Sequence, residues 1–170
     1  IPDDFYCSDR DIFQARLIRM QDELLVSGKD SGFVSLIGST VGEIGNNSYD
    51  HNLGNWPDVP GVFFGYDLHK KIIVLADRGL GILKTLSRVR ASLQTHEEAL
   101  RVAFTETISG RAPENRGNGL KFVRKVIART PIDLYFQTGD ATLYMKGGNI
   151  DFDIEESKEK IQGCLALIKF

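Results

Sequence analysis

The clearest hydrophobic pattern in the chain is the apolar run Ile72–Ala76, which leads directly into an aspartate and two glycines. Because its residues do not alternate with polar ones, the run predicts a β-strand that is covered on both faces. Asp77 ends it, and Gly79 and Gly81 follow. Glycine at a strand exit indicates a turn or a close approach of the backbone to another group. The stretch therefore fits either a ligand site anchored by Asp77 or an aspartate turn with structural glycines.

Two amphipathic helices are predicted before this strand. Ser8 and Asp11 resemble a capping box that opens a helix over about residues 9–27, and Gly28 would end it. The apolar positions of this helix are Ile12, Ala15, Leu17, Ile18, Leu24 and Leu25. A second helix is expected over about residues 31–51, because apolar positions recur there every three or four residues. Its predicted buried stripe consists of Phe33, Ile37, Val41, Ile44 and Ser48.

A polar stripe runs beside the buried stripe of the second helix. Glu43, Asn47 and an acid or histidine at position 50 or 51 project from one helical face about one turn apart. This set suits a divalent-metal phosphate site, although glutamate and asparagine more often lie on a solvated helix face. Gly42 and Gly45 each lower helix propensity by about 1 kcal/mol, which indicates that close backbone approach matters here. The glycines therefore favour a ligand site over a solvated helix face.

The remaining elements alternate between strands and short helices. Val62–Leu68 and Lys71–Ala76 read as a β-hairpin, and Thr95 with Glu98 forms a capping box for a short helix over about 96–105. Beyond Pro131 the chain reads as strands separated by glycine turns at 138–140 and 147–148. These strands are Ile132–Gln137, Thr142–Lys146, Ile150–Ile154 and Cys164–Phe170.

A long stretch without periodicity, 105–118, lies between the short helix and the C-terminal strands. A loop of this length inside a compact domain is usually functional. It contains Arg111 and Arg116, whose guanidinium groups suit an anion. It ends in Gly117 and Gly119, and an amphipathic helix follows. A helix start flanked by glycines offers free amides and the positive end of the helix dipole, so this position is a candidate phosphate site.

Composition narrows the class of protein. The 170 residues are 42% hydrophobic and 26% charged, which predicts one globular domain and excludes disordered and fibrous classes. The net charge of −2 argues against nucleic acid as a partner.

Cys7 and Cys164 lie far apart, so we expect reduced thiols and a cytoplasmic location. No apolar run is long enough for a membrane segment. The chain begins with Ile1, which is consistent with a piece of a longer protein.

Three motifs in order resemble the Bergerat-fold or GHKL ATP-binding family, which includes gyrase B subunits, heat-shock chaperone ATPases and histidine kinases. The resemblance covers about residues 30–170. The motifs match the N, G1 and G2 boxes of that family: Glu43-x-x-x-Asn47, Asp77-x-Gly79-x-Gly81 and Gly117-x-Gly119-Leu120. The N box is closest to the form in histidine kinases and anti-sigma serine kinases, and Gly163-Cys164 stands where the family has a Gly-Thr strand. Asn118 makes the G2 box less typical, and the 170 residues contain no helical hairpin with an acceptor histidine.

The resemblance implies a fold. We expect an α/β two-layer sandwich with a mixed, mostly antiparallel sheet and helices on one face. The chain would be one domain over 1–170, with an N-terminal helix in 1–30 and a lid at about 84–118.

The resemblance also implies ligands and site residues. ATP or ADP would bind with Mg²⁺; Asp77 would accept a hydrogen bond from the adenine amine, and Asn47 would bind the metal ion. Gly79 and Gly81 would let the backbone approach the base. The phosphates would be held by Arg111, Arg116, Gly117, Gly119 and Leu120.

Glu43 decides the predicted reaction. In members of the family that hydrolyse ATP this position is the general base, and phosphotransferring members also often carry an acid there. The sequence therefore predicts ATP binding with phosphotransfer or hydrolysis in signalling, by a kinase or an ATPase. The alternative is a nucleotide-gated interaction switch with little turnover. A signalling protein or phosphoacceptor would be the partner, and the resemblance leaves a homodimer open.

Overall fold

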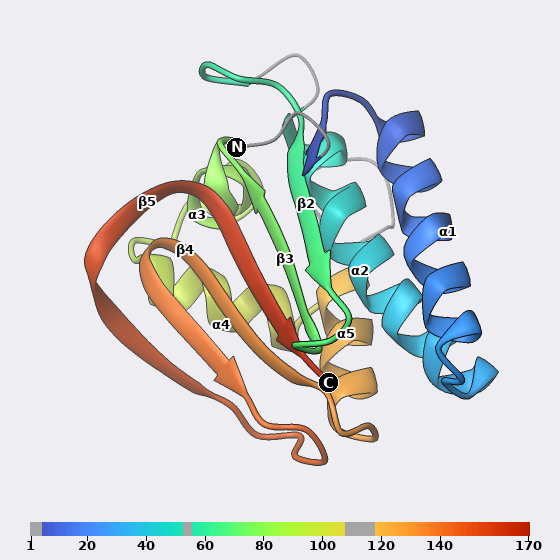
Figure 1. Cartoon of the computed structure of the whole chain (residues 1–170). Helices are drawn as coiled ribbons and strands as arrows, with labels where there is room; N and C mark the ends of the chain where they lie inside the picture. Colours follow the sequence, from blue (N-terminus) through green and yellow to red (C-terminus); the bar gives the residue numbers. More distant parts are fainter. Residues whose placement is uncertain (1–4, 53–55, 108–117) are drawn as a thin grey trace.

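The computed structural model describes residues 5–52, 56–107 and 118–170. Arg111, Arg116 and Gly117 therefore lie outside the described residues. The elements, in chain order, are β1 (Tyr6–Cys7), α1 (Arg10–Val26), α2 (Ser31–Asn52), β2 (Val62–Asp67), β3 (Ile72–Asp77), α3 (Gly81–Leu86), α4 (His96–Thr105), α5 (Gly119–Ile127), β4 (Asp133–Met145) and β5 (Asp153–Lys169). Figure 1 shows a sheet with the helices gathered on one side of it.

The sheet has five strands in the order β1-β2-β3-β5-β4. This arrangement confirms the predicted two-layer sandwich. The four strand pairings that the structure describes are all antiparallel, where the sequence had indicated a mixed sheet. β5 returns between β3 and β4, so Asp77 at the end of β3 stands opposite Val62 on one side and Cys164 on the other. Asp77 is thereby placed in the middle of the sheet.

Strand β3 is not covered on both faces as its apolar run had predicted. Burial alternates along it: Ile73 and Leu75 are buried beneath the helices, while Val74 on the opposite face is only half-buried. The described helices pack on one face of the sheet, so apolar side chains on the other face meet no second layer within residues 5–52, 56–107 and 118–170. Asp77 belongs to the helix-covered face, and its carboxylate is therefore directed into the interior.

The two N-terminal helices begin and end close to their predicted positions. The cap of α1 differs, because the Asp9 side chain accepts a hydrogen bond from the Ile12 amide at 2.9 Å in place of the predicted Ser8 cap. The buried face of α1 also differs from the predicted one and consists of Phe13, Leu17, Met20 and Leu24. Ile12, Ile18 and Leu25, which were expected in the stripe, are exposed.

Gly42 and Gly45 face helix α1, which corrects the prediction that a close approach of the backbone at these glycines marks a ligand site. A Cβ on Gly45 would lie 2.2 Å from the Phe13 ring of α1, and one on Gly42 would lie 3.4 Å from Leu17. Since real Cβ contacts are much longer than 2.2 Å, α1 approaches α2 more closely than any residue other than glycine at position 45 allows. Gly45 therefore sets the distance between the two helices, while a Cβ at Gly42 would make only an ordinary contact with α1.

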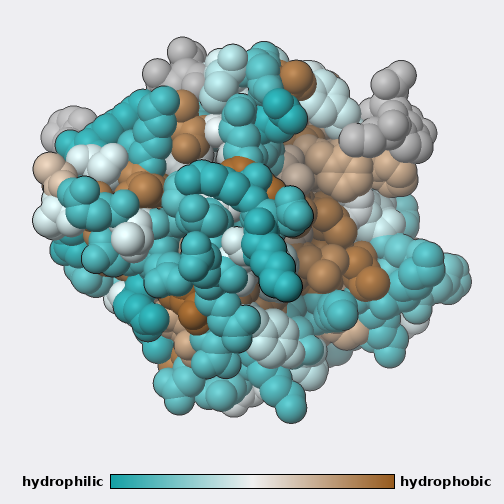
Figure 2. All heavy atoms as spheres, turned by 90° about the vertical axis from the view of Figure 1, so that its left-hand side faces the viewer, coloured by the Kyte–Doolittle hydropathy of each residue, from teal (hydrophilic) through white to brown (hydrophobic). Residues whose placement is uncertain are grey.

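The C-terminal strands form one long hairpin. The predicted turn at 138–140 is wrong: β4 runs through it, with shifts of register on either side of Gly139, whose φ is 58°. A bulge with one residue of positive φ absorbs the irregularity without ending the strand. The turn at Gly147 and Gly148 is confirmed between β4 and β5. Figure 2 faces this hairpin and shows a mainly hydrophilic surface, with hydrophobic atoms gathered toward the right of the view.

Helix α4 has the predicted bounds and capping box. The Glu98 amide donates to the Thr95 hydroxyl at 3.1 Å, and the Glu98 carboxylate accepts from the Thr95 amide. Of the expected lid, 84–118, the described part includes this helix, whose Leu100 and Phe104 are fully buried in the core. Among the helices that the structure describes, none has the length and apolar character needed to cross a membrane.

Candidate functional site

A cavity of about 590 Å³ lies between α2, the end of β3 and the start of α5. Six of the residues predicted from the sequence line it: Glu43, Asn47, Asp77, Gly81, Gly119 and Leu120. Gly79 lies between Asp77 and Gly81 in the loop that joins β3 to α3 and is not one of the residues that line the cavity. The fold thus brings three motifs that are distant in the sequence around one space.

Asp77 forms a polar centre at one end of the cavity. The Ser48 hydroxyl donates to its Oδ2 at 2.7 Å, and the Gly79 amide donates to its Oδ1 at 2.7 Å. The residue is only 8% exposed, and this burial raises the pKa of the Asp77 carboxyl, while hydrogen bonds from Ser48 and from the Gly79 and Cys164 backbones oppose the rise. A carboxylate has about four acceptor positions, so Asp77 keeps capacity for a donor in the cavity.

Beside Asp77, strand β5 and the loop after β3 approach each other very closely. A Cβ on Gly163, whose φ is 82°, would lie 2.1 Å from the Asp77 carbonyl oxygen. Thr138 on β4 links the two segments: its hydroxyl donates to the Gly163 carbonyl at 3.1 Å and accepts from the Ile82 amide at 3.2 Å. Gly81 starts α3 with a φ of 74°. At the base of the cavity, hydrogen bonds and close backbone contacts therefore link β3, β4 and β5 to the start of α3.

Cys164 supplies a thiol to this wall of the cavity. Its Sγ lies 3.7 Å from the Thr138 hydroxyl. Burial, reinforced by the neighbouring Asp77 carboxylate, raises the pKa of the Cys164 thiol well above its ordinary value. The thiol is therefore protonated at neutral pH and acts as an apolar contact rather than a nucleophile.

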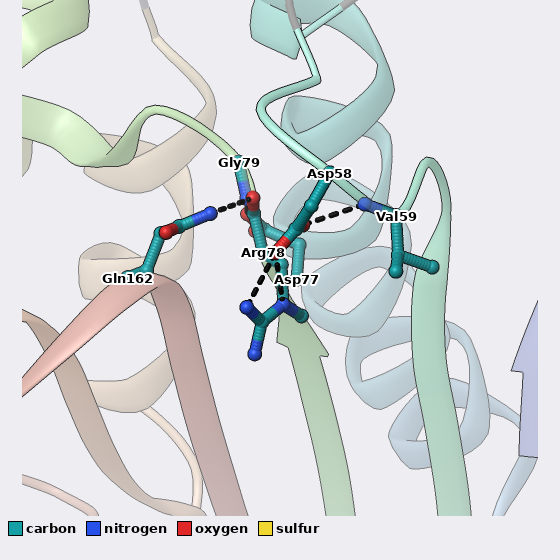
Figure 3. A network of polar contacts seen from close by, with 6 residues as sticks. All are labelled: Asp58, Val59, Asp77, Arg78, Gly79 and Gln162. Carbon is teal, nitrogen blue, oxygen red and sulfur yellow. Dashed lines mark hydrogen bonds and ion pairs between the residues drawn. The ribbon is translucent and has the colours of Figure 1, made fainter.

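The outer side of the loop is anchored by Arg78. Figure 3 shows its side chain turned toward Asp58, where its Nε donates to Oδ2 at 2.8 Å. The Gln162 side chain donates to the Arg78 carbonyl at 2.9 Å. The Arg78 guanidinium lowers the pKa of the exposed Asp58 carboxyl. Arg78 thus holds the loop from the solvent side and does not line the cavity.

At the other end of the cavity, α2 meets the start of α5. A Cβ on Gly119 would lie 2.5 Å from the Glu43 Oε2 and 3.6 Å from the Asn47 Nδ2. The Glu43 carboxylate therefore lies against the backbone of the first residue of α5, where the helix dipole favours negative charge. A larger residue at 119 would displace the Glu43 carboxylate from this position.

Sequence reasoning missed several polar residues that line the cavity, among them Ser48, Asn52 and Arg10. Ser48 was assigned to an apolar stripe, although a serine in such a stripe needs a buried partner, and that partner is Asp77. Asn52 is only 4% exposed, and no sequence pattern indicated that it would belong to the site. Arg10 on α1 also lines the cavity; it forms an ion pair with Asp50, and its guanidinium lies 5.9 Å from the centre of the Tyr49 ring.

The donor set fits a magnesium ion that is held mainly by a ligand. Among the described residues there is no group of three or more histidines, cysteines or carboxylates that could hold a metal ion by itself. The Asn47 side chain lies near Gly119 and carries one amide oxygen that could bind the ion. Mg²⁺ typically takes one or two protein oxygens and completes its shell with phosphates and water, and Asn47 matches that pattern.

Comparisons with known proteins give structural similarity alone. No family model and no curated protein matches the sequence. The structure is similar to the 43K ATPase domain of Thermus thermophilus gyrase B, solved with an aminocoumarin, at 16% identity and a TM-score of 0.44, over 82% of this chain and 34% of that one. It is also similar to the topoisomerase IV ATP-binding domain of Francisella tularensis, solved with a small-molecule inhibitor, at 18% identity and a TM-score of 0.43, over 77% and 35%. The chain thus spans about a third of the length of each.

Proposed function

We propose that this protein binds an adenine nucleotide, ATP or ADP with Mg²⁺, in the cavity between α2 and α5. One observation carries the proposal. A single cavity has a buried carboxylate with spare acceptor capacity, Asp77, at one end, and a glycine helix start beside Glu43 and Asn47 at the other. The ordered motifs that resemble the GHKL family supply the same residues.

Asp77 would recognise the base. Adenine carries an amino group at the position where guanine carries a carbonyl oxygen. A carboxylate that already accepts from Ser48 and Gly79 can accept one more donor but repels an acceptor. The site would therefore select adenine over guanine by a favourable contact with one and repulsion of the other.

The start of α5 would hold the phosphates. The amides of Gly119 and Leu120 lie at the positive end of the helix dipole, and we propose that Gly117, Arg111 and Arg116 complete the phosphate contacts. Asn47 would hold the magnesium ion, which neutralises phosphate charge when bound.

Glu43 would act as the general base that takes a proton from an attacking water in hydrolysis, or it would position a phosphoacceptor in a signalling kinase. A second candidate is a nucleotide-gated switch with little turnover. The close approach of the Glu43 carboxylate to Gly119 supports this alternative, because the carboxylate occupies space next to the proposed phosphate position.

Calorimetric titration of ATP and GTP, each with Mg²⁺, tests the proposal. We expect ATP to bind and GTP to bind at least about 10-fold more weakly, because only adenine donates to Asp77. Inorganic tripolyphosphate is the control for contacts made by the phosphates alone. Equal affinity for ATP and GTP, or no binding of ATP, would contradict the proposal.

A further inference from the structure

We infer that Asn52 is a positioning residue for the base end of the cavity, and that position 79 is glycine in order to admit its side chain. The inference rests on the proposed nucleotide site. It assigns to Asn52 the task of holding the loop between β3 and α3 in the shape that orients Asp77.

Asn52 lies at the end of α2 and reaches across to that loop. Its side chain is buried, and its Oδ1 accepts a hydrogen bond from the Leu80 amide at 2.8 Å. The same residue lines the cavity. A buried amide that satisfies a loop N–H fixes the backbone at that point, because breaking the bond would leave a buried donor unpaired.

Gly79 packs directly against the side-chain amide of Asn52. A Cβ on Gly79 would lie 2.0 Å from the Asn52 Nδ2 and 2.3 Å from its Cγ. The φ of Gly79 lies outside the left-handed region, so the backbone itself does not require glycine there. The side chain of Asn52, rather than backbone conformation, excludes a larger residue at position 79.

The contact acts directly on Asp77. Gly79, whose α-carbon faces the Asn52 side chain, donates its amide to the Asp77 Oδ1 at 2.7 Å. Displacing Gly79 would therefore rotate or release the carboxylate that faces the base. Asn52 also lies on the helix that carries Glu43 and Asn47, so it fixes the base end of the cavity relative to the phosphate end.

A double-mutant cycle tests the inference with the variants Asn52→Ala, Gly79→Ala and the two combined. Calorimetry would give the Kd for ADP, and urea unfolding would give stability. We expect Asn52→Ala to weaken ADP binding about 10-fold, the loss of one buried hydrogen bond. Gly79→Ala should weaken it further, and the double variant should bind no worse than Asn52→Ala, because the vacated volume accepts the new methyl group.

Two controls separate positioning from general damage. Inorganic tripolyphosphate should bind Asn52→Ala as it binds the unaltered protein, because the phosphate end is unchanged, whereas general destabilisation would weaken both ligands. Gly42→Ala is the matched glycine control, since its Cβ would make an ordinary contact of 3.4 Å. If Gly79→Ala alone does not fold, recovery of folding in the double variant reports the same coupling.

The outcomes distinguish this inference from the proposed function. If the unaltered protein binds no ADP, the proposed function fails and the inference fails with it. If the unaltered protein binds ADP and Asn52→Ala binds equally well, the nucleotide site stands and the inference alone is overturned. Purely additive effects in the cycle would overturn it as well, because the two side chains would then not share one space.

Discussion

Replacing Asp77 with asparagine is expected to weaken ADP binding by about 10- to 150-fold while the protein remains folded. A hydrogen bond to a charged group contributes about 1.5–3 kcal/mol, and the amide that replaces the carboxylate is a poorer acceptor. Asparagine can still accept from Gly79 and donate to the Ser48 hydroxyl, so the local hydrogen bonds survive. Calorimetric titration of ADP measures the loss, and the control is Asp140→Asn on β4, because Asp140 pairs with Lys160 and does not line the cavity.

The same substitution is expected to leave stability at pH 7 unchanged or higher. Burial raises the pKa of Asp77 in the folded protein, so the native state binds this proton more tightly than the unfolded chain does. The contribution of Asp77 to stability therefore falls as pH rises from the ordinary carboxyl range through the raised pKa, and asparagine removes this dependence. Urea unfolding at pH 4 and pH 7 measures it. A variant that loses stability together with binding would show that Asp77 is a structural turn residue.

Replacing Glu43 with glutamine is expected to lower ATP turnover by about 100-fold or more and to leave ADP binding intact or slightly tighter. A positioned general base contributes about 10²- to 10⁴-fold, and glutamine cannot take the proton. Removal of the carboxylate from the start of α5 also removes repulsion of phosphate, which explains the retained affinity. Phosphate release and calorimetry on the same samples measure both effects.

The Glu43 variant also separates the two candidate functions. Turnover in the unaltered protein that is lost in Glu43→Gln supports an enzyme. Tight ADP binding without turnover in either protein supports the switch. Loss of ADP binding in Glu43→Gln would contradict both assignments, because Glu43 would then be a ligand of the nucleotide or its metal ion.

Local patterns predicted the elements of the fold well. The helical periodicity of α2, the capping box of α4 and the apolar run of β3 each depend on neighbours in the sequence, and each element is where its pattern indicates. The burial of β3 and the turn at Gly139 were wrong for a shared reason. The burial of β3 depends on whether a second helical layer covers the sheet, and the described residues contain none. The continuation of β4 through Gly139 depends on its pairing with the continuous strand β5.

The candidate site was predictable only where its residues stand in motifs. Glu43, Asn47, Asp77 and Gly119 meet at one cavity, and no local pattern alone states that they meet. Ser48 and Asn52 could not be assigned, because their roles arise from contacts with Asp77, Gly79 and Leu80 about 30 residues away.

The roles of the glycines were the hardest to predict from the sequence. Sequence shows that something comes close to a glycine but not what it is: Gly45 admits the Phe13 ring, Gly163 admits the backbone of Asp77, and Gly119 admits the Glu43 carboxylate. Of these three, only Gly119 lies where a phosphate would bind. The structural partner of each glycine therefore had to come from the fold.

Titration of ¹⁵N-labelled protein with ADP and Mg²⁺, followed by amide NMR shifts, tests the central claim most directly. We expect saturable shifts at both ends of the cavity, at Ser48, Asp77 and Gly79 and at Gly119 and Leu120, with little change at residues of β4 and β5 that do not line the cavity, such as Thr142 and Glu155. Adenosine alone should shift the first group and leave the second. Absence of shifts, or shifts confined to residues outside the cavity, would contradict it.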